Sequence, residues 1–322
     1  MEPILTMLSS GDYVSGEKMS EALGVTRAAV WKRVRTLQEA GWPIESGGKR
    51  GYRLGDHDRL DPETWQHRLR THTVGRSSVR YEYVLSSTNA VLNLMRLQGA
   101  PSGSVCLCEQ QTAGRGRMDR VWVSEPGVGL WVSVLLCPNI TPSHAHNLTF
   151  CAALAMSDAV YAACGFAPGI KWPNDLVYRG KKICGILLEA ATEMDRISGV
   201  TIGTGLNVRA GAVPEELRQQ AGSVEEFGTV SHRRDILVAY LEALERWTDL
   251  LAAEGSAPII DAVAERCVTI GQRVTVSGVH QRFTGLAVGL DESGVLIVRD
   301  ETGTERMVLA GDVSIRGLTG YV

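Results

Sequence analysis

The chain has 322 residues, of which 44% are hydrophobic and 21% charged, and its formal net charge is −3. This length and composition are typical of a globular protein with two or three domains, and the small negative charge excludes nucleic-acid binding by the charge of the whole molecule. The sequence holds no apolar run of about 20 residues and no amino-terminal signal pattern. Its seven scattered cysteines form no CxxC, so we expect buried, reduced thiols in a cytoplasmic protein.

Residues 1–62 are predicted to form a winged helix-turn-helix domain. Short apolar helices are expected over Glu2–Leu8 and Glu17–Leu23, and Thr26 can cap a third helix whose apolar residues recur at helical spacing. Two short strands follow within Ile44–Leu54, on either side of a basic, glycine-rich turn. Three helices and a basic hairpin in this order are typical of a winged helix, in which the third helix lies in the major groove of DNA.

The positive charge of this domain is concentrated in its second half. Between residues 26 and 54 there are seven cations and only two anions. Such a patch attracts phosphates, so we expect DNA contacts from the third helix and the hairpin tip. The alternative is a winged helix that binds a protein and carries a merely solvated basic face. The candidate DNA-binding residues are Thr26, Arg27, Trp31, Lys32, Arg35, Lys49 and Arg50.

Residues 63–267 are predicted to form one central domain, preceded by a charged linker over about 56–71. From residue 79 onward, strand patterns alternate with helical ones, and a long alanine-rich helix over His146–Cys164 is apolar nearly all round, so we expect it to be buried. Strands grouped with a few long helices predict an α+β fold in which helices layer on a mixed sheet. Strands are expected at 79–84, 104–109, 128–136, 169–172, 175–178, 182–190 and 198–203, and further helices at 90–97 and 234–253.

Residues 268–322 are predicted to form a small β domain. The helical patterns end near Cys267, and turn signals such as Asp291-Glu-Ser-Gly294 separate short strands. Five short strands in so few residues predict an SH3-like β-barrel. The strands are expected at 273–277, 282–290, 294–299, 306–309 and 313–316.

The stretch Gln110 to Arg120 carries three arginines within six residues on a glycine-containing loop. Glycines allow backbone N–H groups to approach an anion closely, and arginine provides a planar fork that matches carboxylates and phosphates. This pattern favours a loop beside a nucleotide or an acyl phosphate. An ordinary exposed basic loop is the alternative.

The run Lys171-Trp-Pro-Asn-Asp175 indicates a second functional segment. Lys171 ends a predicted strand and offers a compact cation that can stabilise charge on a phosphoryl group. Asp175 is a candidate ligand for Mg²⁺, which takes only one or two protein carboxylates. Asn and Asp after proline are also common turn residues, so a purely structural interpretation stays open.

Three further segments place small or polar residues where a ligand could approach. Glycines occur in the strand-containing segments 181–189 and 202–208, and a glycine within a strand often marks close approach of a ligand or another backbone. Ser86 to Asn89 precede a helix, where they serve as caps or meet a polar head group. The GxG at Gly203 lacks the third glycine of a dinucleotide fingerprint, and no P-loop occurs.

The order SSTN, QTAGRGR, KWPND, KICGILLE and IGTGLNV resembles the biotin–protein ligase family, and the resemblance covers the whole chain. The amino-terminal winged helix and the small carboxyl-terminal barrel are similar to those of its bifunctional members, which are also biotin-responsive repressors. The resemblance implies a ligase that uses ATP and Mg²⁺ to make biotinyl-5′-AMP and transfers biotin to a lysine of the biotin carboxyl carrier protein of acetyl-CoA carboxylase. It also implies operator DNA as a partner and a homodimer of the adenylate-bound form.

The resemblance also implies roles for individual residues. Lys171, Arg117 and Arg115 are the implied catalytic residues, and residues 209–227 would cover the adenylate. The implied biotin-binding residues are Ser87, Thr88, Asn89, Gln110, Gly114, Arg115, Gly116, Arg117, Lys171, Gly185, Leu187, Gly203 and Gly205. The implied nucleotide-binding residues are Arg117, Arg120, Trp122, Lys171, Asn174 and Asn207, with Asp175 at the metal.

The arginine-glycine loop departs from the family pattern at Asp119, where a further glycine is usual. We expect the Asp119 carboxylate to pair with Arg117 or Arg120 and so to change how tightly the loop retains the adenylate. Three alternatives stay open: a biotin-sensing transcription factor without ligase activity, a lipoate or octanoyl transferase on the same fold, and a ligase whose winged helix no longer binds DNA.

Overall fold

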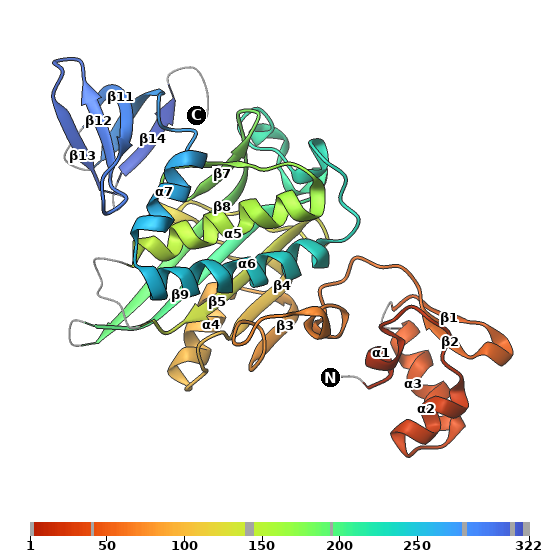
Figure 1. Cartoon of the computed structure of the whole chain (residues 1–322). Coiled ribbons are helices and arrows are strands. Elements are labelled where there is room, and N and C mark those ends of the chain that lie inside the picture. Colours follow the sequence, from red (N-terminus) through yellow and green to blue (C-terminus); the bar gives the residue numbers. More distant parts are fainter. Residues whose placement is uncertain are drawn as a thin grey trace. The chain divides into compact units, whose positions relative to one another are not determined.

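The structure, a computed structural model, describes residues 3–39, 42–138, 145–193, 196–278, 282–309 and 313–317. The chain divides into two compact units, Met1–Arg68 and Leu69–Val322 (Figure 1). The expected boundary after residue 62 lies slightly before this division, because the turn at Pro62–Thr64 packs on the first helix. The expected boundary after residue 267 has no counterpart in it, and the proposed three-domain limits stay predictions.

The first unit contains the predicted helices and hairpin. Helix α1 is Pro3–Leu8, α2 is Gly16–Leu23 and α3 is Arg27–Glu39, followed by β1 (Ile44–Ser46) and β2 (Tyr52–Leu54). Helix α2 begins where the Ser15 side chain accepts a hydrogen bond from the Lys18 N–H, and it ends at Gly24 in a left-handed conformation. The core of the first unit includes Ile4, Leu5, Leu8, Met19, Val30 and Val34.

Gly51 allows the hairpin to lie close to the chain that precedes α2. Its φ is 95°, and a Cβ at this position would lie 2.0 Å from the Val14 carbonyl oxygen. The Tyr13 ring lies beneath the guanidinium of Arg50, 4.2 Å from the ring centroid. A glycine at 51 and an aromatic ring at 13 therefore hold the basic hairpin tip in place.

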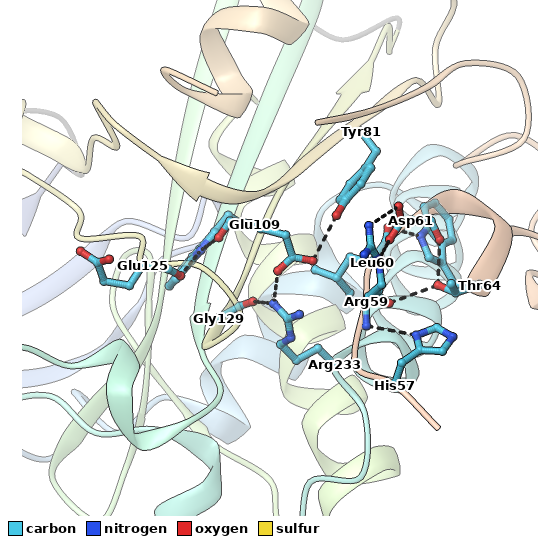
Figure 2. Close-up of polar contacts among 12 residues, drawn as sticks. His57, Arg59, Leu60, Asp61, Thr64, Tyr81, Glu109, Glu125, Gly129 and Arg233 are labelled. Atoms are coloured by element: carbon cyan, nitrogen blue, oxygen red, sulfur yellow. Dashed lines mark hydrogen bonds and ion pairs between the residues drawn. The ribbon is translucent and has the colours of Figure 1, made fainter. Parts of the chain in front are cut away.

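The predicted linker is a folded segment. Leu60 and Trp65 are fully buried, and the Trp65 indole N–H donates to the Leu60 carbonyl at 2.9 Å. Arg59 pairs with Asp61 at 2.8 Å, and the Thr64 hydroxyl donates to the Asp61 carbonyl (Figure 2). The charged composition of this stretch suggested a linker leading into a helix, but these two apolar side chains are buried, and short 3₁₀ turns replace the helix.

The second unit is built on a seven-stranded mixed sheet in the order β3-β4-β5-β9-β8-β7-β6. Strands β3 and β4 are parallel, and every other neighbouring pair is antiparallel. This confirms the predicted mixed sheet. The strands are β3 (Val79–Leu85), β4 (Val105–Gln111), β5 (Gly129–Leu136), β6 (Gly169–Lys171), β7 (Asp175–Tyr178), β8 (Lys181–Glu193) and β9 (Arg196–Asn207).

Helices cover both faces of this sheet (Figure 1). Helix α4 (Thr88–Leu97) packs on one face, whereas α5 (His146–Cys164) and α6 (Arg233–Glu254) lie on the other, with α7 (Ala257–Arg266) at their end. By length and composition α5 could cross a membrane, but twelve of its residues are buried within the unit. Its apolar character is therefore that of a core helix, as predicted. The short helix α7 was not predicted.

The cysteines are free thiols and belong mostly to the core. Cys106 and Cys108 are two residues apart on β4, so both side chains lie on one face of the strand, in an apolar cluster beneath α4. Burial raises the pKa of each thiol to about 12. Cys151, Cys184 and Cys267 are also buried. The prediction of buried reduced thiols fails at Cys137, which is exposed, and in part at Cys164, which is half-buried.

The carboxyl-terminal strands form a separate antiparallel sheet in the order β13-β12-β11-β10-β14. The five predicted strands are thus confirmed, but barrel closure is not shown: in the described part of the chain, β13 and β14 are the two sheet edges. The turn at Gly294 contacts the central sheet, where the Trp172 indole N–H donates to its carbonyl at 3.0 Å. The strands are β10 (Arg273–Gly278), β11 (Arg282–Leu290), β12 (Leu296–Asp300), β13 (Glu305–Val308) and β14 (Val313–Gly317).

A buried ion pair joins the end of β4 to the start of α6. The Arg233 guanidinium donates to Glu109 Oε2 at 2.8 Å and to the Gly129 carbonyl at 2.9 Å, and both charged side chains are at most 5% exposed. Figure 2 shows Tyr81 on the opposite side of the Glu109 carboxylate, with its hydroxyl 3.3 Å away. Each charge thus has several partners, which a desolvated ion pair requires.

Replacing Arg233 by alanine is expected to destabilise the second unit by about 3–5 kcal/mol, because the Glu109 carboxylate would stay buried without its countercharge. The midpoint of urea unfolding, followed by tryptophan fluorescence, measures this loss. Arg246→Ala on the same helix is the control: Arg246 is 64% exposed and 3.9 Å from Asp158, so its loss should change stability by less than about 0.5 kcal/mol. Equal losses of stability for the two variants would contradict the stabilising role of the buried Glu109–Arg233 ion pair.

Candidate functional site

A cleft of about 330 Å³ opens on the face of the central sheet that carries α4. Its walls come from the amino terminus of α4, the arginine-glycine loop, the β6–β7 turn, the middle of β8 and β9, and the segment after β9. All five sequence motifs contribute to this lining: KWPND is complete in it, three of the four residues of SSTN are present, and each of the other three motifs supplies four residues. Residues far apart in the sequence therefore meet at one place.

The amino terminus of α4 is held in the cleft by Gln111. Gln111 Oε1 accepts hydrogen bonds from the Thr88 N–H at 2.9 Å and the Thr88 hydroxyl at 3.1 Å, while its Nε2 donates to Ser124 Oγ at 2.9 Å. Gln111 lines the cleft, and the predicted Gln110 does not. Neighbouring strand residues point to opposite faces, so the prediction chose the wrong one of two adjacent glutamines.

Asn89 lies on the floor of the cleft against β9. Its Oδ1 accepts from the Ser133 hydroxyl at 2.6 Å, and its Nδ2 donates to Glu189 Oε2 at 2.9 Å. A Cβ at Gly203 would lie 2.2 Å from Asn89 Oδ1. The glycine in β9 is therefore required by the close approach of this amide.

Trp122 forms a second wall over two paired glycines. Gly185 of β8 and Gly205 of β9 are partners in the strand register. A Cβ on either glycine would lie within 3.0 Å of the Trp122 ring. The Trp122 ring also lies 5.1 Å from Lys182 Nζ. Its buried indole N–H has no partner among the described residues and lies over Gly205.

The arginine-glycine loop forms a tight hairpin at the mouth of the cleft. The Gly116 N–H donates to the Arg120 carbonyl at 2.7 Å, and the turn between them places Met118 at φ 56° and Asp119 at φ 54°. Glycine adopts this left-handed conformation without steric cost. Asp119 forms no ion pair among the described residues, so the expected pairing with Arg117 or Arg120 is wrong, and the departure from glycine acts on the backbone of the turn instead.

The β6–β7 turn faces this loop across the cleft. Lys171 ends β6 with only 4% exposure. Arg117 Nη1 donates to Asn174 Oδ1 at 3.0 Å, and Asn174 itself is bound to the backbone of Ile186 by two hydrogen bonds of 2.8 and 2.9 Å. Asn174 thus fixes the guanidinium of Arg117 to the central sheet.

The charge of the cleft is strongly positive. Among the described residues, five cationic side chains line it, but only one carboxylate, that of Asp175. Lys182, which begins the KICGILLE motif but was not among the predicted site residues, pairs with Asp175 Oδ1 at 2.7 Å. No group of three potential metal ligands occurs in the described parts of the chain. The lining cations are Arg115, Arg117, Arg120, Lys171 and Lys182.

The segment after β9 lies along the cleft, as expected for residues 209–227. Its start is tied to its end by the ion pair of Arg209 with Glu225 at 3.2 Å. Its middle lies beside β8, where the Gly222 N–H donates to the Lys182 carbonyl and Asn207 Nδ2 donates to the Gly222 carbonyl. Its lining residues are Ala212, Val213, Pro214, Leu217, Gln220 and Ala221.

The structure brings most of the predicted ligand-binding residues together. Apart from Gln110, only Gly114 does not line the cleft, because it packs against the Trp122 backbone, where a Cβ would lie 2.4 Å from the carbonyl oxygen. The predicted residues that line it are Ser87, Thr88, Asn89, Arg115, Gly116, Arg117, Arg120, Trp122, Lys171, Asn174, Asp175, Gly185, Leu187, Gly203, Gly205 and Asn207.

The first unit carries the predicted basic surface. Helix α3 begins after Thr26, whose hydroxyl accepts from the Ala29 N–H at 3.2 Å. One face of α3 exposes Arg27, Trp31 and Arg35 at four-residue spacing, with the Trp31 side chain 54% exposed. Lys32 is exposed beside them, and Lys49 and Arg50 are exposed at the hairpin tip.

Comparison with known proteins agrees with this arrangement. A model of the biotin/lipoate A/B protein ligase family matches residues 81–207, an HTH domain model matches residues 1–53, and a biotin protein ligase C-terminal domain model matches residues 269–316. The bifunctional ligase/repressor BirA of Bacillus spizizenii is 34% identical over 94% of each chain. The chain belongs to the bifunctional BirA family of biotin–protein ligases.

Two other relatives of this family concern the second unit and its cleft. A biotin–[acetyl-CoA-carboxylase] ligase of Paracoccus denitrificans is 34% identical over 72% of this chain and 98% of its own length. The biotin protein ligase of Aquifex aeolicus, solved in complex with biotin and ATP, is 26% identical, with a TM-score of 0.64 over 75% of this chain and 99% of that chain. Biotin is therefore the natural probe for the cleft.

Replacing Gln111 by alanine is expected to weaken biotin binding about tenfold or more, because the two hydrogen bonds that hold Thr88 at the cleft are lost. Gln110→Ala, which removes the neighbouring side chain from the other face of the strand, should leave the affinity within about twofold. Isothermal titration with biotin compares the two variants. A larger loss for Gln110→Ala would show that the strand faces are assigned incorrectly.

Proposed function

We propose that the chain is an ATP-dependent biotin–protein ligase that also acts as a biotin-responsive transcriptional repressor. The observation that carries the ligase assignment is the cleft with five cationic side chains, a single carboxylate and a partly apolar floor. Joining a carboxylate to a triphosphate brings two anions together, so the site must supply positive charge in a place from which water is excluded. The BirA family membership specifies biotin as the carboxylate.

The reaction has two steps. A carboxylate oxygen of biotin attacks the α-phosphorus of ATP, a new P–O bond forms, and pyrophosphate leaves with the electron pair of the broken P–O bond. The ε-amine of the carrier lysine then attacks the acyl carbon of biotinyl-5′-AMP, forms an amide, loses a proton and releases AMP. Both steps pass through states with extra negative charge on oxygen, which fixed cations stabilise.

Lys171, Arg117 and Arg115 are the proposed catalytic residues. Lys171 is nearly inaccessible to solvent at the cleft, so its ammonium group acts in an environment of low dielectric, where its attraction for the carboxylate and the α-phosphate is strong. Arg117 is directed across the cleft by Asn174, and this fixed direction lowers the cost of organising the site when charge develops. Arg115 lies beside it at the mouth of the cleft.

Biotin and the adenylate occupy neighbouring parts of the cleft in this proposal. Biotin lies along Ser87, Thr88, Asn89 and the glycine-rich centre of β8 and β9, with Gln111 in place of the predicted Gln110. The nucleotide lies toward Arg120, Trp122, Asn174 and Asn207. The arginine-glycine loop and residues 209–227 shield the adenylate from hydrolysis.

Mg²⁺ enters this proposal with the phosphates of ATP. Asp175 is the sole carboxylate among the described lining residues, and its ion pair with Lys182 competes with a metal for it. The side chains present therefore do not fit a dedicated Mg²⁺ site, and no step is assigned to the metal.

The repressor role depends on the first unit. The exposed α3 face and the basic hairpin tip suit operator DNA, with phosphate contacts from Lys32 and Lys49 and base contacts from the α3 face. We further propose a cytoplasmic protein that forms a homodimer when the adenylate is bound, because a twofold dimer presents two winged helices to a palindrome. The SH3-like assignment of the carboxyl-terminal sheet is likewise a proposal, supported by its five antiparallel strands.

The ligase is tested by mixing the protein with Mg-ATP, biotin and a biotin carboxyl carrier domain of acetyl-CoA carboxylase, and by weighing the carrier in a mass spectrometer. A gain of one biotinyl group is expected with the natural chain, and a rate reduced at least about 100-fold with Lys171→Ala. Arg273→Ala, which removes a cation from the carboxyl-terminal sheet, is the control. Intact biotin binding without any mass gain would favour the biotin sensor that lacks ligation, and labelling with lipoate in preference to biotin would favour the transferase.

Lys32→Ala and Lys49→Ala are each expected to weaken binding of biotin-gene upstream DNA and to lower the slope of log K against log salt by about one. Arg273→Ala removes the same charge outside the first unit and should leave the slope unchanged. Fluorescence anisotropy at several salt concentrations measures the slopes. Equal slopes for all proteins would indicate that the basic face is only solvated.

A further inference from the structure

Glu189 lies beside the cleft, in contact with Asn89 and Arg115 of its lining, and takes no part in the two reaction steps. It follows Gly185 and Leu187 along β8 at two-residue spacing, so its side chain points to the same face of the sheet as the cleft floor. The carboxylate is 30% exposed. Three side chains from two other parts of the chain converge on it.

One oxygen of Glu189 orients two amides of α4. Oε2 accepts from Asn89 Nδ2 at 2.9 Å and from Asn93 Nδ2 at 3.1 Å. The carbonyl oxygens of the two amides accept from the Ser133 and Thr201 hydroxyls at 2.6 and 2.7 Å. Each amide therefore has its nitrogen toward Glu189 and its oxygen toward a hydroxyl, which leaves one orientation for Asn89 on the floor of the cleft.

The other oxygen of Glu189 meets the arginine-glycine loop. Arg115 Nη2 lies 3.5 Å from Glu189 Oε1, and the Arg115 side chain is 49% exposed. An ion pair this exposed is weak and sensitive to salt. It nevertheless connects the loop that carries Arg115 and Arg117 to strand β8 of the central sheet.

We propose that Glu189 is a positioning residue with two separable actions: Oε2 holds Asn89 in the orientation that receives biotin, and Oε1 docks Arg115 so that the loop stays over the adenylate. The inference rests on the proposed ligase function. It predicts that biotin affinity depends on the first contact, and that retention of biotinyl-5′-AMP before transfer depends on the second.

Two substitutions separate these actions. Glu189→Gln can keep an oxygen toward Asn89 and Asn93, but it then presents an NH₂ group to Arg115. Its KM for biotin should stay within about twofold, while pyrophosphate released per biotinylated carrier should rise about two- to fivefold, as expected for loss of an exposed ion pair. Glu189→Ala removes both contacts and should also raise the KM for biotin about tenfold.

Salt and a second substitution provide independent measurements. Raising the ionic strength should move the pyrophosphate-to-carrier ratio of the natural chain toward that of Glu189→Gln, and it should change the variant little. In the background of Arg115→Ala, Glu189→Gln should add no further uncoupling, because its partner is already absent. Glu301→Gln, which removes an exposed carboxylate 3.0 Å from Arg273, is the matched control and should behave as the natural chain.

The outcomes distinguish this inference from the proposed function. A natural chain that biotinylates no carrier would contradict the ligase itself. A natural chain that labels the carrier while both Glu189 variants keep its KM and its pyrophosphate ratio would overturn the role of Glu189. A Glu189→Gln variant with a lowered melting temperature and slower turnover, but an unchanged ratio, would show a merely structural carboxylate and would equally overturn it.

Discussion

The close approach of Trp122 and Asn89 to the glycines of β8 and β9 determines how the rest of the cleft is arranged. A Cβ at Gly203 or Gly205 would lie 2.2 or 2.6 Å from an atom of these side chains, so only glycine allows both to lie on the sheet. Asn89 places the start of α4, and Trp122 places the chain that leaves the arginine-glycine loop. The two walls are therefore positioned by the absence of side chains on the floor between them.

The walls hold a concentration of cations that the protein stabilises by different means. Lys171 is buried, Arg117 is directed by Asn174, and Lys182 is neutralised by Asp175. These contacts are made by the protein's own groups, so little reorganisation is needed when negative charge develops during adenylation. The buried Glu109–Arg233 pair has no part in the cleft, but it fixes the strand that continues into Gln111.

Local sequence patterns predicted elements well, whereas they did not predict where side chains point. The bounds of α5, β7 and β11 agree with those expected, because apolar periodicity and turn residues are local. Gln111 was missed because the face of a strand residue depends on register with neighbouring strands. The strand glycines were expected to allow close approach of a ligand or another backbone, but the groups that approach them are the side chains of Trp122 and Asn89, which are distant in sequence. Lys182 and Glu189 begin and end the KICGILLE motif but were not predicted as site residues, since their contacts with Asp175, Asn89 and Arg115 arise only in the fold.

The central claim is that this cleft holds an activated form of biotin and passes it on. A single-turnover chase tests it most directly: the protein is loaded with biotin and α-³²P-labelled ATP without carrier, separated from free nucleotide and mixed with carrier. The account predicts label bound to the protein as biotinyl-5′-AMP, then released as AMP in step with biotinylation of the carrier. Biotin bound without any retained label, or label retained but not released by carrier, would contradict it.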